Sequence, residues 1–503
     1  MGFWSNRALA VRGSAQPSPI KLGLYCDHAT GKTGDSNLYH GERHVLIHGL
    51  NGAGKSTRFL IELLMTSTGR SIVVFDIKGE LAAQTADYRR ASGNDVKIIA
   101  PWGTVGLSSD GYNPMSSLDP DNHNEFFGRA ALHADATIEM EGDSQRYWSE
   151  SAQGMMQGAE MFEAIAAKRS GRMPSLLHVR QLLCEPDEFE TVMVGGKRRR
   201  RQSKGLAVNC ARMIRYGGPA VAGLVGRFVR EHGQNELASI QSTFDTHTRF
   251  LLAPPIARDF QRGRWDFRQL RQRPTTVYIV LPAEAITAMR RWTRLLITEA
   301  LCAHFRPGPV PTLFILDEFY AAVGHLKIIA DVWSLVRGYG VQLMPIVQSA
   351  LQLQALYKTE WENFAAQAGM VATIGPAGDT FSAEFFSKRS GNTTMLQYGF
   401  NLGDGESSGD GLNTGTGTSG VNFSTNQGSG RNWGRNTSGG FNVAQIERRA
   451  FLPQDFMDLQ PGYGRMWLPG MGTKSIPFFA PNYWKYRSAP WVRHVRPNPY
   501  RTG

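Results

Sequence analysis

Hydrophobic residues along this chain fall mainly into short continuous runs, several of which precede stretches with helical spacing. The run at residues 44–47 precedes a stretch, residues 59–64, whose apolar residues lie on one face of a helix. Similar runs occupy residues 71–76 (SIVVFD) and the neighbourhood of Val96. Continuous runs rich in β-branched residues are typical of parallel strands covered by helices on both faces. The pattern therefore predicts an α/β fold around a parallel sheet.

The middle of the chain interrupts this pattern. Residues 120–238 are rich in Ala, Met and Glu and contain few strand-like runs, which predicts an all-α insertion domain. Strand-like runs then resume, the last three about 30 residues apart as in βα units. They begin at Val277, Thr312, Val341 and Met370. We therefore expect one α/β domain, formed by residues 44–119 and 239–400, with the helical domain inserted into it.

Three segments lie outside these domains. Residues 1–43 show no sustained pattern and predict a loop-rich N-terminal segment. Residues 401–442 consist mostly of Gly, Ser, Asn and Thr, which bury too little apolar area to fold, so we expect a flexible segment. It is either a linker or mobile loop, or a loop that contacts substrate in a pore. Residues 443–503 are expected to close on the α/β domain and to end in a basic, aromatic tail.

The first strand and the first helix are joined by an octet, Gly49–Ser56 (GLNGAGKS), that fits the phosphate-loop pattern G-x-x-x-x-G-K-[ST] at every fixed position. Its glycines allow successive backbone N–H groups to point at a phosphate chain. We expect Lys55 to reach the β- and γ-phosphates of ATP and the Ser56 hydroxyl to hold Mg²⁺. The expected nucleotide-binding residues are Gly49, Asn51, Gly52, Ala53, Gly54, Lys55, Ser56 and Thr57.

A second motif, residues 312–319 (TLFILDEF), has the form of a Walker B strand. Asp317, at the strand end, can hold Mg²⁺ through water, and Glu318 can orient and deprotonate the attacking water. An Asp-Glu pair after an apolar strand can also be a helix cap. The phosphate loop earlier in the chain favours the catalytic interpretation.

Two further residues are catalytic candidates. Gln348 ends the next strand-like run, where P-loop motors of the RecA type place a polar residue that senses the γ-phosphate. Arg337 is the best candidate for the arginine that ring motors often supply to a neighbouring subunit. The alternatives are a surface or helix-capping glutamine and a helix-end arginine that interacts with the helix dipole. With Glu318, these two complete the expected catalytic set.

The formal net charge of +12 favours acidic partners such as nucleic acid or an anionic membrane surface. Residues 197–201 (KRRRR) could neutralise phosphates or attract anionic lipid, but such runs are more often solvated loops. The tail at residues 485–501 mixes cations with aromatic residues, which suits single-stranded nucleic acid. Packing of its aromatic residues on the main domain is an equally good interpretation.

Cysteine usage and hydropathy indicate the compartment. The four cysteines lie far apart without CxxC spacing, as expected of cytosolic free thiols rather than of a zinc site or a disulfide framework. No window approaches 18 consecutive apolar residues, and the N-terminus lacks the apolar core of a signal peptide. We therefore expect a soluble, cytoplasmic protein.

Several motifs, taken in order, resemble those of the type IV secretion coupling proteins, the ATPases of conjugation. Residues 76–80 (DIKGE) are similar to the D-x-K-G-E segment of that family, and residues 112–114 (YNP) to the tripeptide before its helical insertion. Residues 317–319 stand where the family has D-E-F. Residues 337–357 are similar to its R-x-x-G, Q-S, Q-L and Y block, and residues 375–391 to its last ATPase segment.

The resemblance covers about residues 44–400, with weaker similarity in residues 449–484. It implies a RecA-like P-loop domain with an inserted all-α domain, six copies of which form a ring with ATP sites between subunits. It also implies roles in phosphate and metal binding, hydrolysis, γ-phosphate sensing and action in trans. The residues that match these roles are, respectively, Lys55 and Ser56, Asp317 and Glu318, Gln348, and Arg337.

By the same resemblance, the protein receives a DNA–relaxase complex or an effector protein and drives it into a type IV secretion channel. The implied partners are single- or double-stranded DNA, relaxase or effector proteins, channel components and further copies in a homo-hexamer. Members of the family usually begin with transmembrane helices, which this chain lacks. We therefore expect either a separate membrane-anchoring subunit or a soluble form, peripheral at the inner face of the bacterial cell membrane.

Two other functions remain open at this point. One is a P-loop DNA translocase of the septal or packaging type, which would carry a DNA-reading module at its C-terminus. The other is a nucleotide-gated substrate receptor without sustained pumping. Steady-state ATP hydrolysis distinguishes the receptor from the two motors.

Overall fold

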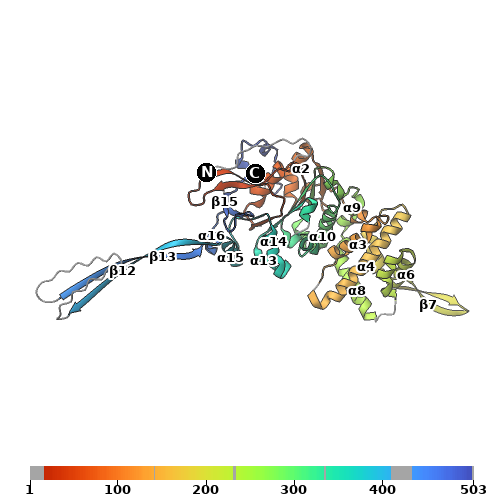
Figure 1. The fold of residues 1–503 in the computed structure, drawn as a ribbon. Coiled ribbons are helices and arrows are strands. Elements are labelled where there is room, and N and C mark those ends of the chain that lie inside the picture. Colours follow the sequence, from red (N-terminus) through yellow and green to blue (C-terminus); the bar gives the residue numbers. More distant parts are fainter. Residues whose placement is uncertain (1–15, 141, 230–233, 334–335, 409–432, 501–503) are drawn as a thin grey trace. The chain divides into compact units, whose positions relative to one another are not determined.

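The computed structural model describes residues 16–140, 142–229, 234–333, 336–408 and 433–500. They divide between two compact units, one within Met1–Asp379 and Leu459–Gly503 and the other within Thr380–Asp458. The first unit contains a large sheet and the helical insertion, and the second a long hairpin flanked by two short helices (Figure 1). Each unit is considered by itself below.

An eleven-stranded sheet organises the first unit. Seven of its strands are parallel neighbours in the order β11-β3-β10-β9-β4-β8-β5. Six of them, all but β5, are almost entirely buried, as is typical of continuous apolar runs, and the predicted α/β fold is confirmed. Their bounds are β3 Val45–Gly49, β4 Ser71–Ile77, β5 Asp95–Ile99, β8 Thr275–Leu281, β9 Thr312–Leu316, β10 Val341–Val347 and β11 Met370–Ile374.

Four antiparallel strands extend this sheet beyond β11. In order from β11 they are β14 Tyr463–Trp467, β15 Ile476–Phe479, β1 Ile20–Cys26 and β2 Thr33–Tyr39. The prediction of a loop-rich segment over residues 1–43 is therefore wrong for β1 and β2. Apolar residues at every second position from Ile20 to Cys26 were the available strand signal. The partner strand β15 lies more than 430 residues away in the sequence, which no local pattern could indicate.

Helices cover the sheet and lead into the insertion. The phosphate loop continues into a π-helical turn, η1 Ser56–Leu60, and then into α1 Ile61–Thr66. Helix α10 Ile286–Cys302 is buried without interruption from Trp292 to Cys302. A helix buried all round lies in the interior. Other helices of this part are α2 Glu80–Ala91, α11 Phe319–Ala322, α12 Lys327–Val332, α13 Ala350–Tyr357 and α14 Trp361–Gln367.

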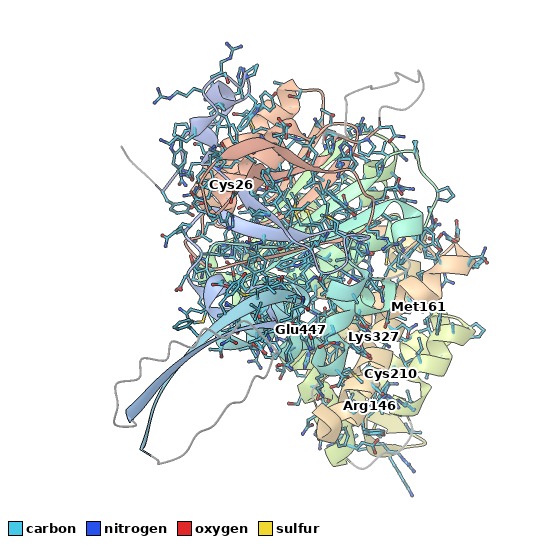
Figure 2. The ribbon with its side chains drawn as sticks, turned by 60° about the vertical axis from the view of Figure 1, so that its left-hand side comes forward. Cys26, Arg146, Met161, Cys210, Lys327 and Glu447 are labelled. Atoms are coloured by element: carbon cyan, nitrogen blue, oxygen red, sulfur yellow. The ribbon has the colours of Figure 1, made fainter. Side chains whose placement is uncertain are left out.

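The insertion is a bundle built around its longest helix, α4 Gly142–Arg169 (Figure 1). Met161 of α4 and Cys210 of α6 are both buried within it (Figure 2). The other helices of the bundle are α3 His123–Thr137, α5 Leu176–Cys184, α6 Leu206–Tyr216, α7 Pro219–Val225 and α8 Gln234–Thr248, and α9 Pro254–Arg262 follows them. Because α8 packs on α4 and α5, the bundle continues past residue 238, where the sequence predicted that it would end. Among the described residues, no helix combines the length and apolar character needed to cross a membrane.

The insertion is not all-α, because an antiparallel hairpin interrupts its helices. Strand β6 Glu188–Val194 pairs with β7 Lys197–Lys204. The two residues between them, Gly195 and Gly196, have φ of +57° and +77°, as a tight two-residue hairpin turn requires. A Gly-Gly pair between two such runs was a usable hairpin signal. We instead expected a solvated loop here, because runs of charged residues such as the arginines after the Gly-Gly pair are typical of solvated loops.

The second unit also departs from expectation. Strand β12 Asn392–Ser408 pairs along its whole length with β13 Trp433–Arg449, from Asn392↔Arg449 to Ser408↔Trp433. The flexible segment predicted for residues 401–442 is therefore strand at both ends, while residues 409–432 lie outside the described part. Amino-acid composition indicates how much apolar surface a segment can bury. It does not indicate whether the backbone of that segment forms hydrogen bonds with a distant strand. The short helices of this unit are α15 Thr380–Arg389 and α16 Pro453–Met457, so residues 380–400 do not belong with the parallel sheet.

Candidate nucleotide-binding site

The candidate site lies at the carboxyl edge of the parallel sheet. Strands β3, β10, β9 and β4 are consecutive neighbours, and each ends in one of the motifs found in the sequence. The phosphate loop follows β3, Gln348 follows β10, and Asp317 and Glu318 follow β9. Parallel strand direction therefore brings all three motifs to one edge, as is general for ligand sites in open α/β sheets.

The phosphate loop is shaped to receive a chain of phosphates. Gly52 and Gly54 have φ of +83° and +82°, which a residue with a Cβ adopts only at a cost. Among the described residues, the N–H groups of Gly52, Gly54 and Lys55 have no hydrogen-bond acceptor. Lys55 is 8% exposed, and its Nζ donates to the Gly49 carbonyl at 3.0 Å. The loop thus presents unpaired N–H groups and a held cation together.

Glu318 is the meeting point of the three motifs. Its Oε1 lies 3.7 Å from Lys55 Nζ, and its Oε2 accepts a hydrogen bond of 2.6 Å from Gln348 Nε2. The backbone N–H of Gln348 in turn donates to Gln352 Oε1 at 2.9 Å. Glu318 has φ of +50°, a left-handed conformation that is uncommon for a residue with a side chain. The side chain of the proposed base is therefore held from two sides.

Two buried carboxylates lie behind this group. Burial raises the pKa of Asp317 to about 6; the Lys55 ammonium opposes this shift and Glu318 adds to it. Burial also raises the pKa of Asp76 to about 7, although the N–H groups of Ala82 and Leu81 favour its charged form. Asp317 contributes to the rise at Asp76. The edge is thus rich in confined negative charge, which a divalent cation would stabilise.

The remaining predicted residues differ in whether the structure places them at the site. Asn51 is exposed, whereas Ala53 is 3% exposed and packs at the end of β11. Ser56 begins the helix after Lys55. Thr57 donates from its hydroxyl to Asn482 Oδ1 at 2.9 Å, so the C-terminal segment occupies that side chain. Arg337 lies in the 3-10 helix η8 Val336–Tyr339, at the amino end of β10 and not at this edge.

Sequence reasoning missed three contributors to the site. Asp76 entered only through a motif; its Oδ2 accepts the Ala82 N–H at 2.7 Å and so supports the start of α2. Gly375, at the end of β11, lies so close to the phosphate loop that a Cβ there would stand 3.1 Å from Ala53 Cβ. Asn482 lies far along the chain from Thr57. The DIKGE motif was a local signal for Asp76 and the Gly-Pro pair after β11 was one for Gly375, whereas Asn482 had none.

The residues present fit Mg²⁺ and ATP. The loop offers unpaired N–H groups and Lys55 for phosphate oxygens, and hard oxygen ligands, which Mg²⁺ prefers, come from Ser56 and Asp317. Burial raises the pKa of Asp317, and a bound cation would favour the charged form of this carboxylate. The site therefore has the chemistry of a magnesium–nucleotide site.

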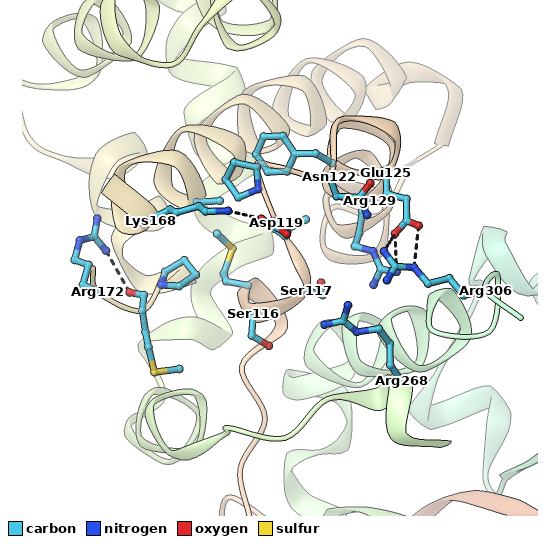
Figure 3. Close-up of a pocket in the computed structure, with 17 residues that line it drawn as sticks. Ser116, Ser117, Asp119, Asn122, Glu125, Arg129, Lys168, Arg172, Arg268 and Arg306 are labelled. Atoms are coloured by element: carbon cyan, nitrogen blue, oxygen red, sulfur yellow. Dashed lines mark hydrogen bonds and ion pairs between the residues drawn. The ribbon is translucent and has the colours of Figure 1, made fainter. Parts of the chain in front are cut away.

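A second polar cavity, of about 470 Å³, lies where the insertion meets the segments that precede β8 and β9 (Figure 3). Its cations are paired: Lys168 Nζ lies 2.8 Å from Asp119, and Arg306 lies 2.5 Å from Glu125. These pairs tie the insertion to the sheet domain. The cavity therefore offers little uncompensated charge to a ligand.

The fold and the site together define a P-loop NTPase fold of the RecA-like type, with a helical insertion. The chain belongs to the type IV secretory system conjugative DNA transfer family, which it matches over residues 14–414. The family indicated by the sequence motifs is thereby confirmed.

Individual relatives agree with this assignment. The chain is 23% identical over 411 residues to the conjugal transfer protein TraG of Escherichia coli, covering 76% of this chain and 61% of TraG. It is 25% identical over 375 residues to the protein VirD4 of Agrobacterium fabrum, covering 72% of this chain and 51% of VirD4. The chain thus spans 51% to 61% of the length of these curated relatives.

The solved structures show the same fold. The plasmid coupling protein TrwB in complex with the ATP analogue ADPNP superposes with a TM-score of 0.59 at 14% identity, covering 94% of this chain and 96% of TrwB. TrwB in complex with ADP and Mg²⁺ gives a TM-score of 0.56, also at 14% identity, covering 88% of this chain and 85% of TrwB. At this level of identity the similarity establishes the architecture.

Proposed function

We propose that this chain is an ATP-hydrolysing coupling protein that recruits a DNA–relaxase complex or an effector protein and drives its transfer into a type IV secretion channel. The observation that carries the proposal is the convergence of Lys55, Glu318 and Gln348 from three separate motifs at one sheet edge. The family and the TrwB complexes with ADPNP and with ADP and Mg²⁺ support it. ATP and Mg²⁺ are the proposed cofactors.

Each residue of the site has a separate role in ATP hydrolysis. When bound, Mg–ATP supplies the phosphoryl group and the cation that polarises it. The loop N–H groups and Lys55 bind phosphate oxygens, while Ser56 and Asp317 hold the metal. Glu318 orients a water and accepts its proton at the carboxylate, and Gln348 fixes the direction of that carboxylate. On nucleotide binding, Lys55 Nζ would exchange its hydrogen bond to the Gly49 carbonyl for phosphate oxygens.

The proposal extends to assembly and location. Six copies would form a ring in which Arg337 of one copy completes the ATP site of the next, as ring motors arrange their trans-acting arginines. The ring would work peripherally at the inner face of the bacterial cell membrane, where the channel opens. The DNA, the relaxase or effector, and the channel components are its proposed partners.

Two substitutions test the motor function. Lys55→Ala should lose ATP binding and abolish substrate transfer between cells. Glu318→Gln should still bind ATP, with hydrolysis slowed on the order of 10²- to 10⁴-fold by loss of the base. Glu360→Gln, at an exposed carboxylate outside the site, serves as the matched control and should hydrolyse normally.

The measurements are steady-state ATPase rates with and without DNA, ATP-analogue binding, and transfer frequency. Normal transfer by Lys55→Ala would exclude a motor. Absence of hydrolysis in the wild type, with effector proteins still bound by the insertion, would establish the nucleotide-gated receptor instead.

A further inference from the structure

The hairpin of the helical insertion, strands β6 and β7 with the Gly195–Gly196 turn, carries a run of five consecutive cationic residues, Lys197–Arg201. Every residue of Lys197–Arg201 is exposed, and the two strands extend beyond the helices of the bundle (Figure 1). In an antiparallel ribbon successive side chains point to opposite faces, so the charged side chains have defined directions. Arg198 and Arg200 lie on one face, and Lys197, Arg199 and Arg201 lie on the other.

Only some of these cations are neutralised within the hairpin. Arg201 forms an ion pair of 2.5 Å with Glu190, and Lys204 forms one of 2.9 Å with Glu188. Within the part of the chain that the structure describes, Arg198, Arg199 and Arg200 have no carboxylate partner. The guanidinium of Arg200 instead lies over the Phe189 ring, 4.0 Å from its centroid. Three consecutive arginines near the tip therefore carry charge that nothing in the described chain compensates.

The spacing and the residue type suit a row of phosphates. Same-face side chains of a strand recur every two residues, about 6.6–6.8 Å, and the phosphates of one DNA strand advance about 3.4 Å each along the axis. Same-face arginines are therefore far enough apart to contact separate phosphates. Arginine presents a planar fork that binds phosphate oxygens in a bidentate way, which lysine does not. A two-stranded ribbon is also narrow enough to enter the major groove of B-form DNA.

Duplex DNA fits this ribbon better than other polyanions do. Single-stranded nucleic acid is bound by stacking of successive bases on several aromatic faces, whereas this ribbon has one aromatic residue, Phe189, which is 48% exposed and already has the Arg200 guanidinium over its ring. Membrane insertion requires an apolar surface, and the tip offers only Met193 and Val194, which are 63% and 55% exposed. These two residues flank the turn and are opposed across the ribbon by Arg198 and Lys197.

We propose that the β6–β7 hairpin is a docking surface for the phosphate backbone of duplex DNA, with Arg198, Arg199 and Arg200 as its contacts. The inference deepens the proposed function, on which it rests, by assigning the nucleic-acid partner to a definite surface. It places DNA contact on the helical insertion, apart from the phosphate loop. The contact is made to phosphates and is therefore independent of base sequence.

Binding of the full-length chain to a fluorescein-labelled duplex of about 30 base pairs, over a range of KCl concentrations, tests the proposal. The triple variant Arg198→Gln, Arg199→Gln, Arg200→Gln should lose affinity on the order of 10²-fold or more at about 0.1 M salt. Its log–log salt slope should be shallower by about 2.7, since each phosphate contact contributes about 0.9. The Arg→Lys triple variant keeps the charge and should keep most of the slope.

The matched control removes three exposed cations elsewhere: Lys32→Gln, Lys358→Gln, Lys474→Gln. Circular dichroism confirms that each variant is folded. Equal loss of duplex affinity in this control, or an unchanged affinity in the hairpin variant, would overturn the proposal. So would a hairpin variant that loses binding to vesicles of anionic phospholipid while keeping duplex DNA. ATPase activity is read separately, so failure of the motor function would leave the binding result interpretable.

Discussion

At the scale of single residues, Glu318 shows how the site is organised. Its left-handed backbone costs a residue with a Cβ about 1–2 kcal/mol, and such strain collects where function needs a particular direction. The Glu318 carboxylate lies with its Oε1 3.7 Å from Lys55 Nζ and with its Oε2 2.6 Å from Gln348 Nε2. We infer that the strained turn at the end of β9 sets the carboxylate toward the phosphate loop.

A prediction at this scale concerns Gly375, whose φ is +73°. In Gly375→Ala the new methyl group would stand 3.1 Å from Ala53 Cβ and push against the phosphate loop. We expect ATP-analogue affinity, measured by isothermal titration calorimetry, to weaken about tenfold, which equals about 1.4 kcal/mol. Stability should fall by about 1–2 kcal/mol from the backbone strain alone.

Gly470→Ala separates the two effects. Gly470 has φ of +84°, but a Cβ there would meet nothing within 4 Å. This variant should lose similar stability and keep its affinity for nucleotide. Equal loss of affinity in both variants would contradict the contact between β11 and the loop.

At the scale of elements, a buried ion network joins the insertion to the sheet domain. His133 of α3 lies with its Nε2 2.6 Å from Glu299 Oε1 of α10, and Tyr112 donates to Glu299 Oε2 at 2.7 Å. Arg129 of α3 lies 3.5 Å from the same carboxylate, and Glu160 of α4 lies 3.5 Å from His133 Nδ1. Removing one partner of such a group leaves a buried charge and typically costs about 3–5 kcal/mol.

The network predicts a pH dependence of stability. Burial opposes the charged form of His133, but Glu299 and Glu160 outweigh it and raise its pKa to about 9. A raised folded-state pKa contributes stability that is complete below the ordinary value of 6.5 and is lost as the pH rises through about 9. Denaturant unfolding of wild type and His133→Gln should therefore differ most near pH 6 and converge above about pH 9.

His123→Gln is the control for this measurement, because His123 is exposed on the same helix. Its free energy of unfolding should follow the wild type across the range. A constant difference between wild type and His133→Gln from pH 6 to 10 would contradict a charged His133 in the folded protein.

At the scale of the whole molecule, the sheet separates the two ends of β10. Gln348 follows its carboxyl end, whereas Arg337 precedes its amino end, a separation of seven strand residues or about 23 Å. A parallel sheet cannot bring both ends of one strand to one edge. This separation supports the proposal that Arg337 serves the site of a neighbouring copy.

Mixing two inactive variants tests action in trans. Arg337→Ala and Lys55→Ala should each lose ATPase activity when assembled alone. An equal mixture should recover up to about a quarter of the wild-type rate, since one interface in four pairs an intact loop with an intact arginine. Failure of the mixture to recover activity, in rings shown by mass to contain both variants, would argue against the trans role.

The sequence by itself determined the features whose signals are local. Eight contiguous residues specify the phosphate loop, and most of the buried parallel strands contain one continuous apolar run, so both were predictable. The Walker B strand and the family motifs could likewise be identified from the sequence. These features depend on neighbours along the chain, which a linear pattern records.

Tertiary structure alone decided how those parts combine. The distances that join Lys55, Glu318 and Gln348 depend on strand order, and the pairing of β1 with β15 and of β12 with β13 depends on partners far along the chain. The hairpin of the insertion likewise turned an arginine run that resembled a loop into an ordered ribbon. Backbone hydrogen bonds and burial stabilise contacts between segments that are distant in the sequence. Composition and periodicity do not specify which distant segment will be the partner.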